Sequence, residues 1–335
     1  MNGGIERLDT IMDVPPGWDH LARSYFQQRE FLAHCETHNV CQQRYYVLSS
    51  GRAVLAGASV YTLELDLLTW LNVRSPVRMH IVGIPCSVSC PGVIGEEGAQ
   101  QNLLRGILRC EKGLLVCLNL DRTPGNIPMS VGRTWPSVVF ANRFHSWEEY
   151  KSSLRSTYRR RLASIEQTIE RLSIRTAPCS TFTEEMYRLY LDVLDRSEGK
   201  LEKLKSDFFR MLPSRFRLMT FSQNGHLCGW AITLSDRDRF SFFLGGQDYQ
   251  MAPREIYLAK LVTILRAGIE SGAKTIDLGQ SAEVPKTRLG GVCHEKLMLT
   301  HHHNVLLDGA LRASMGILSY RRRVPQTHVY RESAP

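Results

Sequence analysis

A strand that ends in two glycines and runs toward a helix is the first place where this sequence could do chemistry. Residues 240–253 read FSFFLGGQDYQMAP, with Gly245 and Gly246 closing the predicted strand and Pro253 at the predicted start of the helix. Proline suits the first turn of a helix, and the open N–H groups there attract anions such as phosphate. Strand backbone near the glycines would be free to hydrogen-bond a ligand. An ordinary strand–helix connection is the alternative interpretation.

The basic segment after the next predicted strand is a second candidate. The strand KTIDLG runs into residues 277–291, DLGQSAEVPKTRLGG, which carry Lys286 and Arg288. Ligands of α/β sheets lie beyond the carboxyl ends of strands, where a lysine could bind phosphate or stabilise an oxyanion. A solvated basic loop is the alternative, and for Arg288 it is the favoured interpretation.

Three side-chain clusters are weaker candidates. Arg159–Arg161 would form either a basic wall for a phosphate-rich ligand or a solvated helix face. The side chains of His301–His303 alternate between the two faces of a strand, so one could act as a base, while a metal site there is not expected. Cys293–His294 are neighbours in sequence, which rarely form a nucleophile–base pair. The chain has no GxxxxGK[ST], HExxH or GxSxG motif, which disfavours phosphate-loop, zinc-protease and α/β-hydrolase chemistry.

Strands and helices alternate along the whole chain. Residues 146–172 predict one long helix with an apolar face and a capping box at its start. A three-strand meander follows, with its first turn at Asn224–Gly225, and then a helix and the strand of residues 274–279. In the first half, a helical pattern over residues 17–38, a hairpin, a helix over residues 98–112 and the buried strand LLVCLNL indicate a mixed α and β unit.

The bulk composition is that of a globular protein of two domains. The chain has 335 residues, of which 43% are apolar and 22% are charged. The formal net charge of +9 suits a polyanionic partner such as coenzyme A or transfer RNA. Nine scattered cysteines favour reduced thiols and no metal centre. With no spanning segment and no signal peptide apparent, we expect a cytoplasmic protein.

Taken in order, these features resemble the FemAB/CelD-like (BioF2-like) acyltransferases, a branch of the GNAT superfamily. WEEYKSSLRSTYRRRLASIEQ is similar to the family's helix W-x-E-Y…L-x-x-x-x-R-x-x-x-R. FLGGQDYQMAPREIYLAKLVTILRAGIESGAKTIDLG is similar to its strand, G-x-D-x-x-x-x-x-P loop, helix and closing G-x-x-x-x-D-L/F-G. Lys286 to Gly290 are similar to Y-K-x-x-x-G, with Pro285 in place of the aromatic residue.

The resemblance implies an α+β chain of two tandem GNAT-like domains, residues 1–145 and 146–335. Each would be a mostly antiparallel mixed sheet flanked by helices, with the site in the second domain. The acyl donor would lie where two neighbouring strands splay apart, with its pyrophosphate at the following helix. The donor would contact Leu244, Gly245, Gly246, Arg254, Gln280 and Arg288. The catalytic candidates are Lys286 for charge stabilisation, Asp277 for orienting the amine, and Tyr257 as a base. For Asp277 a structural contact at the strand end is the alternative.

The implied reaction joins an activated acyl group to the amine of a small molecule or peptide. Acyl-CoA is the leading donor, although the usual Q/R-x-x-G-x-G/A signature is not found before the helix. Aminoacyl-tRNA, the donor of the Fem-type relatives, is the alternative and would make transfer RNA a partner. A non-catalytic binding module is the third interpretation. We expect no metal, no DNA and no membrane partner.

Overall fold

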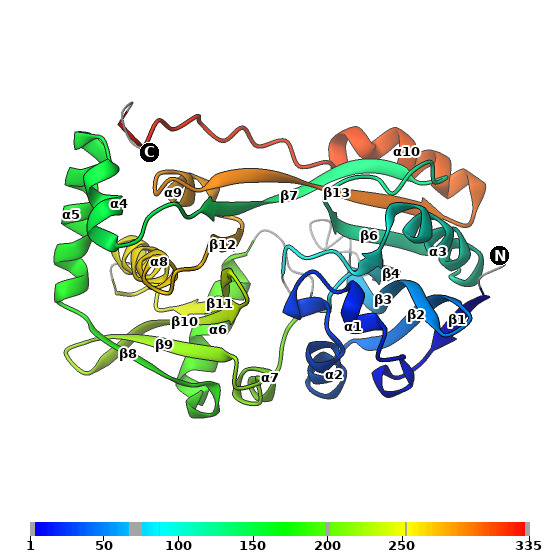
Figure 1. Ribbon diagram of the computed structural model, residues 1–335, viewed down its shortest axis with the longest axis horizontal. Helices are drawn as coiled ribbons and strands as arrows, with labels where there is room; N and C mark the ends of the chain where they lie inside the picture. Colours follow the sequence, from blue (N-terminus) through cyan, green and yellow to red (C-terminus); the bar gives the residue numbers. More distant parts are fainter. Residues whose placement is uncertain (1–3, 67–75, 87, 198–201, 252, 332–335) are drawn as a thin grey trace. The chain divides into compact units, whose positions relative to one another are not determined.

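The chain folds into two compact units. The computed structural model describes residues 4–66, 76–86, 88–197, 202–251 and 253–331 (Figure 1). The first unit is made of Met1–Trp135, Leu201–Lys205 and Glu295–Arg321, and the second of Pro136–Lys200, Ser206–His294 and Arg322–Pro335.

The sheet of the first unit has the strand order β1-β2-β3-β4-β6-β13, with β5 paired to β3. Only β4 and β6 in this row run parallel. The strands are β1 (Gly4–Leu8), β2 (Gln42–Ser50), β3 (Ala53–Asp66), β4 (Pro76–Val82), β5 (Val93–Gly95), β6 (Leu114–Leu120) and β13 (Val292–His302). The helices are α1 (Trp18–Leu21), α2 (Arg29–His38), α3 (Glu97–Cys110) and α10 (Val305–Leu318), with short 3-10 turns at Ile11–Asp13 and Tyr25–Gln27.

Helix α3 supplies much of the first unit's core. Its buried positions Leu103, Leu104 and Ile107 fall on one face at helical spacing and meet β2 and β3. The helical pattern expected over residues 17–38 is divided in the structure into α1, a 3-10 turn and α2. Ser24 causes part of this division, because its extended backbone and its side chain cap the 3-10 turn at Phe26 N–H.

The sheet of the second unit has the order β7-β12-β11-β10-β9-β8, in which only β11 and β12 run parallel. The strands are β7 (Ser130–Ala141), β8 (Ser173–Pro178), β9 (Phe216–Gln223), β10 (His226–Asp236), β11 (Arg239–Gln247) and β12 (Thr275–Gln280). The helices are α4 (Trp147–Ser153), α5 (Ser156–Glu170), α6 (Glu184–Arg196), α7 (Ser206–Arg210), α8 (Pro253–Glu270) and α9 (Glu283–Thr287), with a 3-10 turn at Cys179–Thr181.

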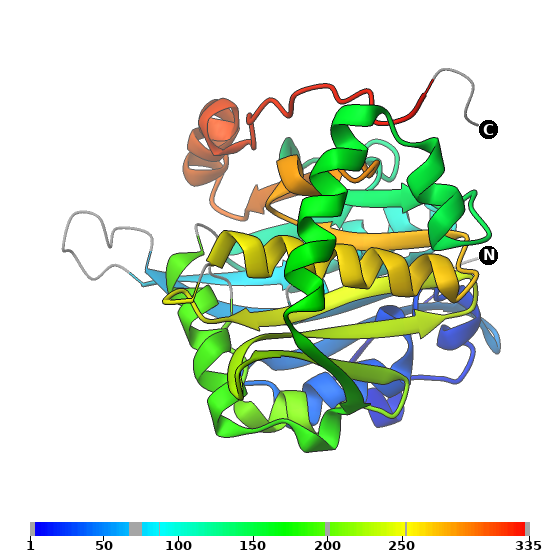
Figure 2. The ribbon, with the colours of Figure 1, turned by 90° about the vertical axis from the view of Figure 1, so that its left-hand side faces the viewer.

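Helix α8 is the central helix of the second unit. One side packs on β10, β11 and β12, and α5 crosses its other side (Figure 2). This double cover explains why apolar residues surround α8 instead of forming one stripe. Helix α6 packs on β10 and β11 as well, where the indole N–H of Trp230 donates to the carbonyl of Met186 at 2.7 Å.

The mixed α/β fold class expected from the sequence is confirmed, with two corrections of detail. The single helix expected over residues 146–172 is broken at Leu154 and Arg155. The C-terminal segment causes the break: Leu154 forms a β-bridge with Tyr330, and Arg155 N–H donates to Val329 O at 3.0 Å. The loop expected over residues 277–291 contains the short helix α9.

The compact units also differ from the expected division at residue 145. The first long segment of the first unit ends at Trp135, and the unit also includes Glu295–Arg321 from near the end of the chain. The physical reason is strand pairing, because β13 lies antiparallel to β6 from Leu297 opposite Leu120 to His302 opposite Leu114.

Candidate active site

Strands β11 and β12 separate shortly after they meet. Their parallel pairing covers Arg239, Phe240 and Ser241, the last of which lies opposite Asp277. From there β11 continues to Gln247 with its pairing to β10 intact. Within the described strands, residues 242–247 therefore have β10 on one side and no paired strand on the other. The splayed strands expected from the family resemblance are present at the expected place.

Two local irregularities produce the splay. The β10–β11 register shifts between Ile232 and Thr233, which leaves Phe243 as an extra residue in β11. Such a bulge bends a strand and increases its twist. In β12, Gly279 has a φ of 75°, a left-handed conformation that glycine adopts without steric cost. The carboxylate of Asp277 holds this bend by accepting the N–H of Gly279 at 2.8 Å.

Lys286 holds the loop that follows β12. Its side chain is buried, and Nζ donates to the carbonyls of Gly279, Gln280 and Ser281 at 3.2, 2.7 and 2.7 Å. The loop needs this support because Ser281 and Ala282 both have positive φ, a strained conformation for residues other than glycine. Burial lowers the pKa of Lys286 to about 8, against the opposing charges of Asp277 and Glu283.

Lys286 and Asp277 thus make contacts other than those expected for catalytic groups. The three N–H donors of Lys286 all meet backbone carbonyls, and Asp277 accepts a backbone N–H. Gln280 contributes its carbonyl to the same arrangement. We therefore treat these residues as supports of the splayed strand end; their expected catalytic and donor-binding roles stay predictions.

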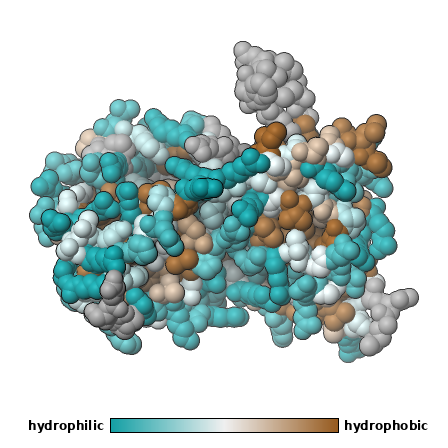
Figure 3. Space-filling model, turned by 90° about the horizontal axis from the view of Figure 1, so that it is seen from above, coloured by the Kyte–Doolittle hydropathy of each residue, from teal (hydrophilic) through white to brown (hydrophobic). Residues whose placement is uncertain are grey.

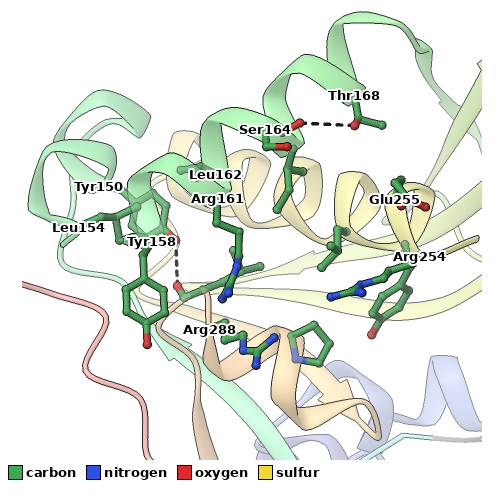
Figure 4. Close-up of a pocket in the computed structure, with 15 residues that line it drawn as sticks. Tyr150, Leu154, Tyr158, Arg161, Leu162, Ser164, Thr168, Arg254, Glu255 and Arg288 are labelled. Atoms are coloured by element: carbon green, nitrogen blue, oxygen red, sulfur yellow. Dashed lines mark hydrogen bonds between the residues drawn. The ribbon is translucent and has the colours of Figure 1, made fainter. Parts of the chain in front are cut away.

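A pocket of about 520 Å³ opens beside the start of α8. It is lined by α5, the first turns of α8, α9 and the residues just after α9. Arg161 comes from α5, Arg254 from α8 and Arg288 from the end of α9, and their guanidinium groups point into the same space (Figure 4). Glu255 is the only acidic residue among those that line it. Three positive charges against one negative charge make this pocket attractive to anions.

The rest of the pocket wall is largely apolar. Leu154, Leu162, Ile165 and Leu258 contribute hydrophobic surface, and Tyr257 lines the wall between α8 and α9. Burial raises the pKa of the Tyr257 phenol, which therefore stays protonated at neutral pH and can donate a hydrogen bond. An apolar wall with arginines suits a ligand that carries phosphates on a less polar body.

Of the expected donor-binding residues, the pocket brings together Arg254 and Arg288, with the catalytic candidate Tyr257 beside them. Leu244, Gly245 and Gly246 lie in the splayed part of β11, opposite Ile232, Ala231 and Trp230 of β10. All three arginines of the run on α5 are exposed, and of these Arg161 lines the pocket.

The histidines considered as bases belong to the other unit. His301 pairs with Asp308 at 3.2 Å, His302 accepts the N–H of Asn304, and His303 accepts the N–H of Gly113. Among the described residues, no group of three His, Cys, Asp or Glu side chains could hold a metal ion.

Lys260 is a site residue that the sequence predictions did not include. It lies on α8, is 3% exposed, and Nζ donates to the carbonyl of Gly246 at 2.8 Å. Burial lowers the pKa of this ammonium to about 7. A signal was present in the sequence, because Lys260 stands alone among apolar residues in the helix IYLAKLVTIL.

The loop between β11 and α8 is fixed by an acidic residue. Asp248 donates its N–H to Cys228 O, accepts the N–H of Gln250 at 2.8 Å, and pairs with His226 Nε2 at 2.8 Å. Burial opposes ionisation of Asp248, but these hydrogen bonds bring its pKa below the usual value. These contacts fix the described part of the loop as far as Gln250.

Comparisons with known proteins agree with this geometry. Residues 152–287 match the family described as acetyltransferase (GNAT) domain. The structure of FemX superposes with a TM-score of 0.55 at 8% sequence identity, covering 92% of this chain and all of that one. L-PGS from Bacillus licheniformis gives a TM-score of 0.53 at 12% identity, over 87% of this chain and 96% of that one.

A tandem GNAT protein from the clavulanic acid biosynthesis pathway gives a TM-score of 0.50 at 9% identity, covering 89% of this chain and 98% of that one. None of the curated proteins matches the chain. Residues 152–287 therefore match a GNAT acetyltransferase domain, and the fold of the chain resembles those of FemX, L-PGS and the tandem GNAT protein.

Proposed function

We propose that this protein is an N-acyltransferase that joins an acyl group from acyl-CoA to a small amine or peptide. The observation that carries the proposal is the end of β11, residues 242–247, which extends past its last partner in β12 beside an arginine-lined pocket at the start of α8. A donor with an amide-bearing arm and phosphates fits both parts. Its arm can hydrogen-bond backbone groups along this strand end, as an added strand would, and its phosphates can meet Arg161, Arg254 and Arg288.

The chemistry asks little of the protein beyond positioning. The amine attacks the acyl carbon, a C–N bond forms, the bond from the acyl carbon to the sulfur breaks, and the released CoA thiolate takes up the proton that the amine loses. Holding the two reactants together removes much of the entropic barrier. In this proposal Gly245 and Gly246 align the donor, while Lys286 and Asp277 hold the end of β12 in place. Tyr257 is the proposed donor of a hydrogen bond within the site.

Aminoacyl-tRNA is the second candidate donor. The fold likeness to FemX covers that whole chain, and the net charge of +9 suits a nucleic-acid donor. The same amide bond would form, with an ester in place of the thioester. A binding module without catalysis is the third candidate, and it predicts ligand binding without turnover.

No described helix combines the length and apolar character needed to cross a bilayer. We propose a cytoplasmic location, supported by the nine cysteines, all of which are free.

Calorimetric titration with CoA and acetyl-CoA, at low and moderate salt, tests the leading proposal. We expect micromolar binding that survives moderate salt, and an affinity about tenfold lower for Arg254→Ala, which removes one charged contact to phosphate. Arg266→Ala is the matched control, because Arg266 lies on the same helix and pairs with Glu270 at its other end. Acetyl transfer to a panel of amines then separates an enzyme from a binding module.

Two results would count against acyl-CoA. If the protein does not bind CoA, or if moderate salt abolishes binding, transfer from charged tRNA becomes the next assay. If Arg266→Ala weakens binding as much as Arg254→Ala, the start of α8 is not the phosphate site.

A further inference from the structure

Helix α10 in the first unit exposes an apolar face. It carries five large hydrophobic side chains that are more than half exposed, and two of them, Leu306 and Ile317, are each 84% exposed. The five are Val305, Leu306, Leu307, Ile317 and Leu318. Figure 3 views the molecule from the side on which α10 lies and shows hydrophobic surface gathered in the part of the view that α10 occupies.

The exposed apolar residues form a stripe along the helix. Leu306, Ala310, Ala313 and Ile317 follow at intervals of four, three and four residues, which places them on one face, and all four are exposed. The opposite side holds the helix to its unit through buried Met315, which accepts a hydrogen bond from Thr300. The stripe is therefore an outward surface and not part of the core.

The charges on and after α10 are arranged to suit an anionic surface. The two charged residues within the helix, Asp308 and Arg312, pair with each other at 3.6 Å. Residues 309–331 then contain five arginines and no aspartate or glutamate. Three of these, Arg321–Arg323, begin three residues after the last residue of the helix and are exposed.

We propose that α10 and Arg321–Arg323 dock the protein on an anionic lipid bilayer, with the apolar stripe in the interface and the arginines at the headgroups. An amphipathic helix beside basic residues binds such surfaces through apolar burial and electrostatic attraction together. The 14 residues of α10 span about 21 Å, too short to cross the hydrocarbon core, so the helix lies in the plane of the membrane.

The charge distribution disfavours a second copy of this chain as the occupant. In a twofold contact the same surface meets itself, so the arginine-rich segment of one copy would face that of the other. Residues 309–331 contain no acidic residue that could neutralise this repulsion. The absence of a membrane partner was expected because no segment could span a bilayer. A helix that lies in the membrane interface does not need the length of a spanning segment, so the expectation does not apply to α10.

Flotation of the full chain with lipid vesicles tests the proposal. We expect binding to vesicles of equimolar phosphatidylglycerol and phosphatidylcholine, and at least about tenfold weaker binding to phosphatidylcholine alone. Leu306→Gln/Ile317→Gln should reduce binding to the anionic vesicles more than about tenfold, since both apolar anchors are lost. Arg321→Gln/Arg322→Gln/Arg323→Gln should reduce it about a hundredfold, and high salt should act in the same direction.

Met12→Gln is the matched control, because Met12 is 80% exposed in the same unit but lies outside α10. Circular dichroism and thermal melts would establish that each variant is folded. The proposal is overturned if the anionic vesicles do not bind the protein, or if the α10 variants bind as the control does. It is also overturned if the protein is dimeric in solution and Leu306→Gln/Ile317→Gln makes it monomeric, which would assign the stripe to a second copy.

Discussion

Among the described strands of each unit there is one parallel pair, and the two pairs end differently. In the first unit, β4 stays paired to β6 up to its last residue, Val82. The chain then folds back on itself, with Gly83 bridged to Pro91 and the side chain of Asn119 donating to Val88 O. In the second unit, β11 extends six residues past its last partner in β12. The same local pairing is closed by the protein's own backbone in one unit and left open in the other.

The helices after these strands differ in the same sense. Helix α3 begins with Glu96 and Glu97, and Glu97 pairs with Arg122 at 3.4 Å. Helix α8 begins with Pro253 and Arg254, next to Arg161 and Arg288. Both helix starts carry partial positive charge from the backbone, but the arginine at the start of α3 is paired with Glu97, whereas the pocket at the start of α8 has three arginines and one glutamate. Among the described elements of the second unit, a strand that outruns its partner and a basic helix start occur together, and this is where we propose the donor site.

Removing the three arginines at the start of α8 should have the largest effect on the difference between the two helix starts. Arg161→Ala/Arg254→Ala/Arg288→Ala should weaken CoA binding about a hundredfold, because three charged hydrogen-bond donors at a partly exposed site are lost. Arg122→Ala, at the helix start of the first unit, should leave the affinity unchanged. Calorimetry measures both. If both variants lost the same amount of CoA affinity, the starts of α3 and α8 would not differ in CoA binding.

Exchanging charges between the helix starts should have the next largest effect. Arg254→Glu should lower CoA affinity about thirtyfold at low salt and less at high salt, since it replaces attraction by repulsion at a screened site. Glu97→Arg should create no CoA binding in the Arg161→Ala/Arg254→Ala/Arg288→Ala variant, because β4 of the first unit stays paired to β6 up to its last residue. New binding in that variant would show that charge alone decides the site.

The buried cations of the two units should respond differently to pH. Arg44 of the first unit pairs with Glu111, whereas Lys260 meets one carbonyl and its pKa is about 7. The folded state therefore binds fewer protons than the unfolded state between about pH 7 and pH 10, and this group makes stability rise with pH there.

Lys260→Met should consequently raise the free energy of unfolding by about 1–2 kcal/mol at pH 6. The gain should shrink as the pH rises above 7, because the wild-type amine is then neutral when folded. Urea unfolding at pH 6 and pH 9 measures this. A gain that does not change with pH would assign Lys260 a pKa outside this range, and a loss at both pH values would make its hydrogen bond to Gly246 stabilising.

Weakening the contact between Asn119 and Val88, which lies beyond the β4–β6 pair of the first unit, should have the smallest effect. Asn119 has a φ of 62°, so Asn119→Gly relieves backbone strain while it loses the hydrogen bond to Val88. These opposing terms should leave the free energy of unfolding within about 1 kcal/mol of wild type, with CoA affinity unchanged. Thermal melts and titration check both. A changed CoA affinity would connect the first unit's strand pair to the donor site.

The sequence predicted the parts of the site whose signals are local. Gly245, Gly246 and Pro253 punctuate the chain because turns and helix starts demand them, and the strand–helix order around them was correct. The break at Leu154 depends on Tyr330, far along the chain, so no local pattern could indicate it. For the same reason the sequence could not predict that Arg161 lies in one pocket with Arg254 and Arg288. The three meet because α5 crosses α8. The triple carbonyl contact of Lys286 follows from left-handed residues at 281 and 282, which have no signature in residue type.

The return of β13 to the first unit sets an order for synthesis on the ribosome. Strand β6 receives its partner β13 only after residues 295–302 have been made, which is after the entire open strand pair and α8. During translation the edge of β6 that pairs with β13 therefore stays uncovered until most of the chain has been made. By then all the strands of the second unit's sheet, from β7 to β12, have already been synthesised. A fragment that stops before residue 295 would leave that edge uncovered, and it should be recovered as aggregate and not as a folded half.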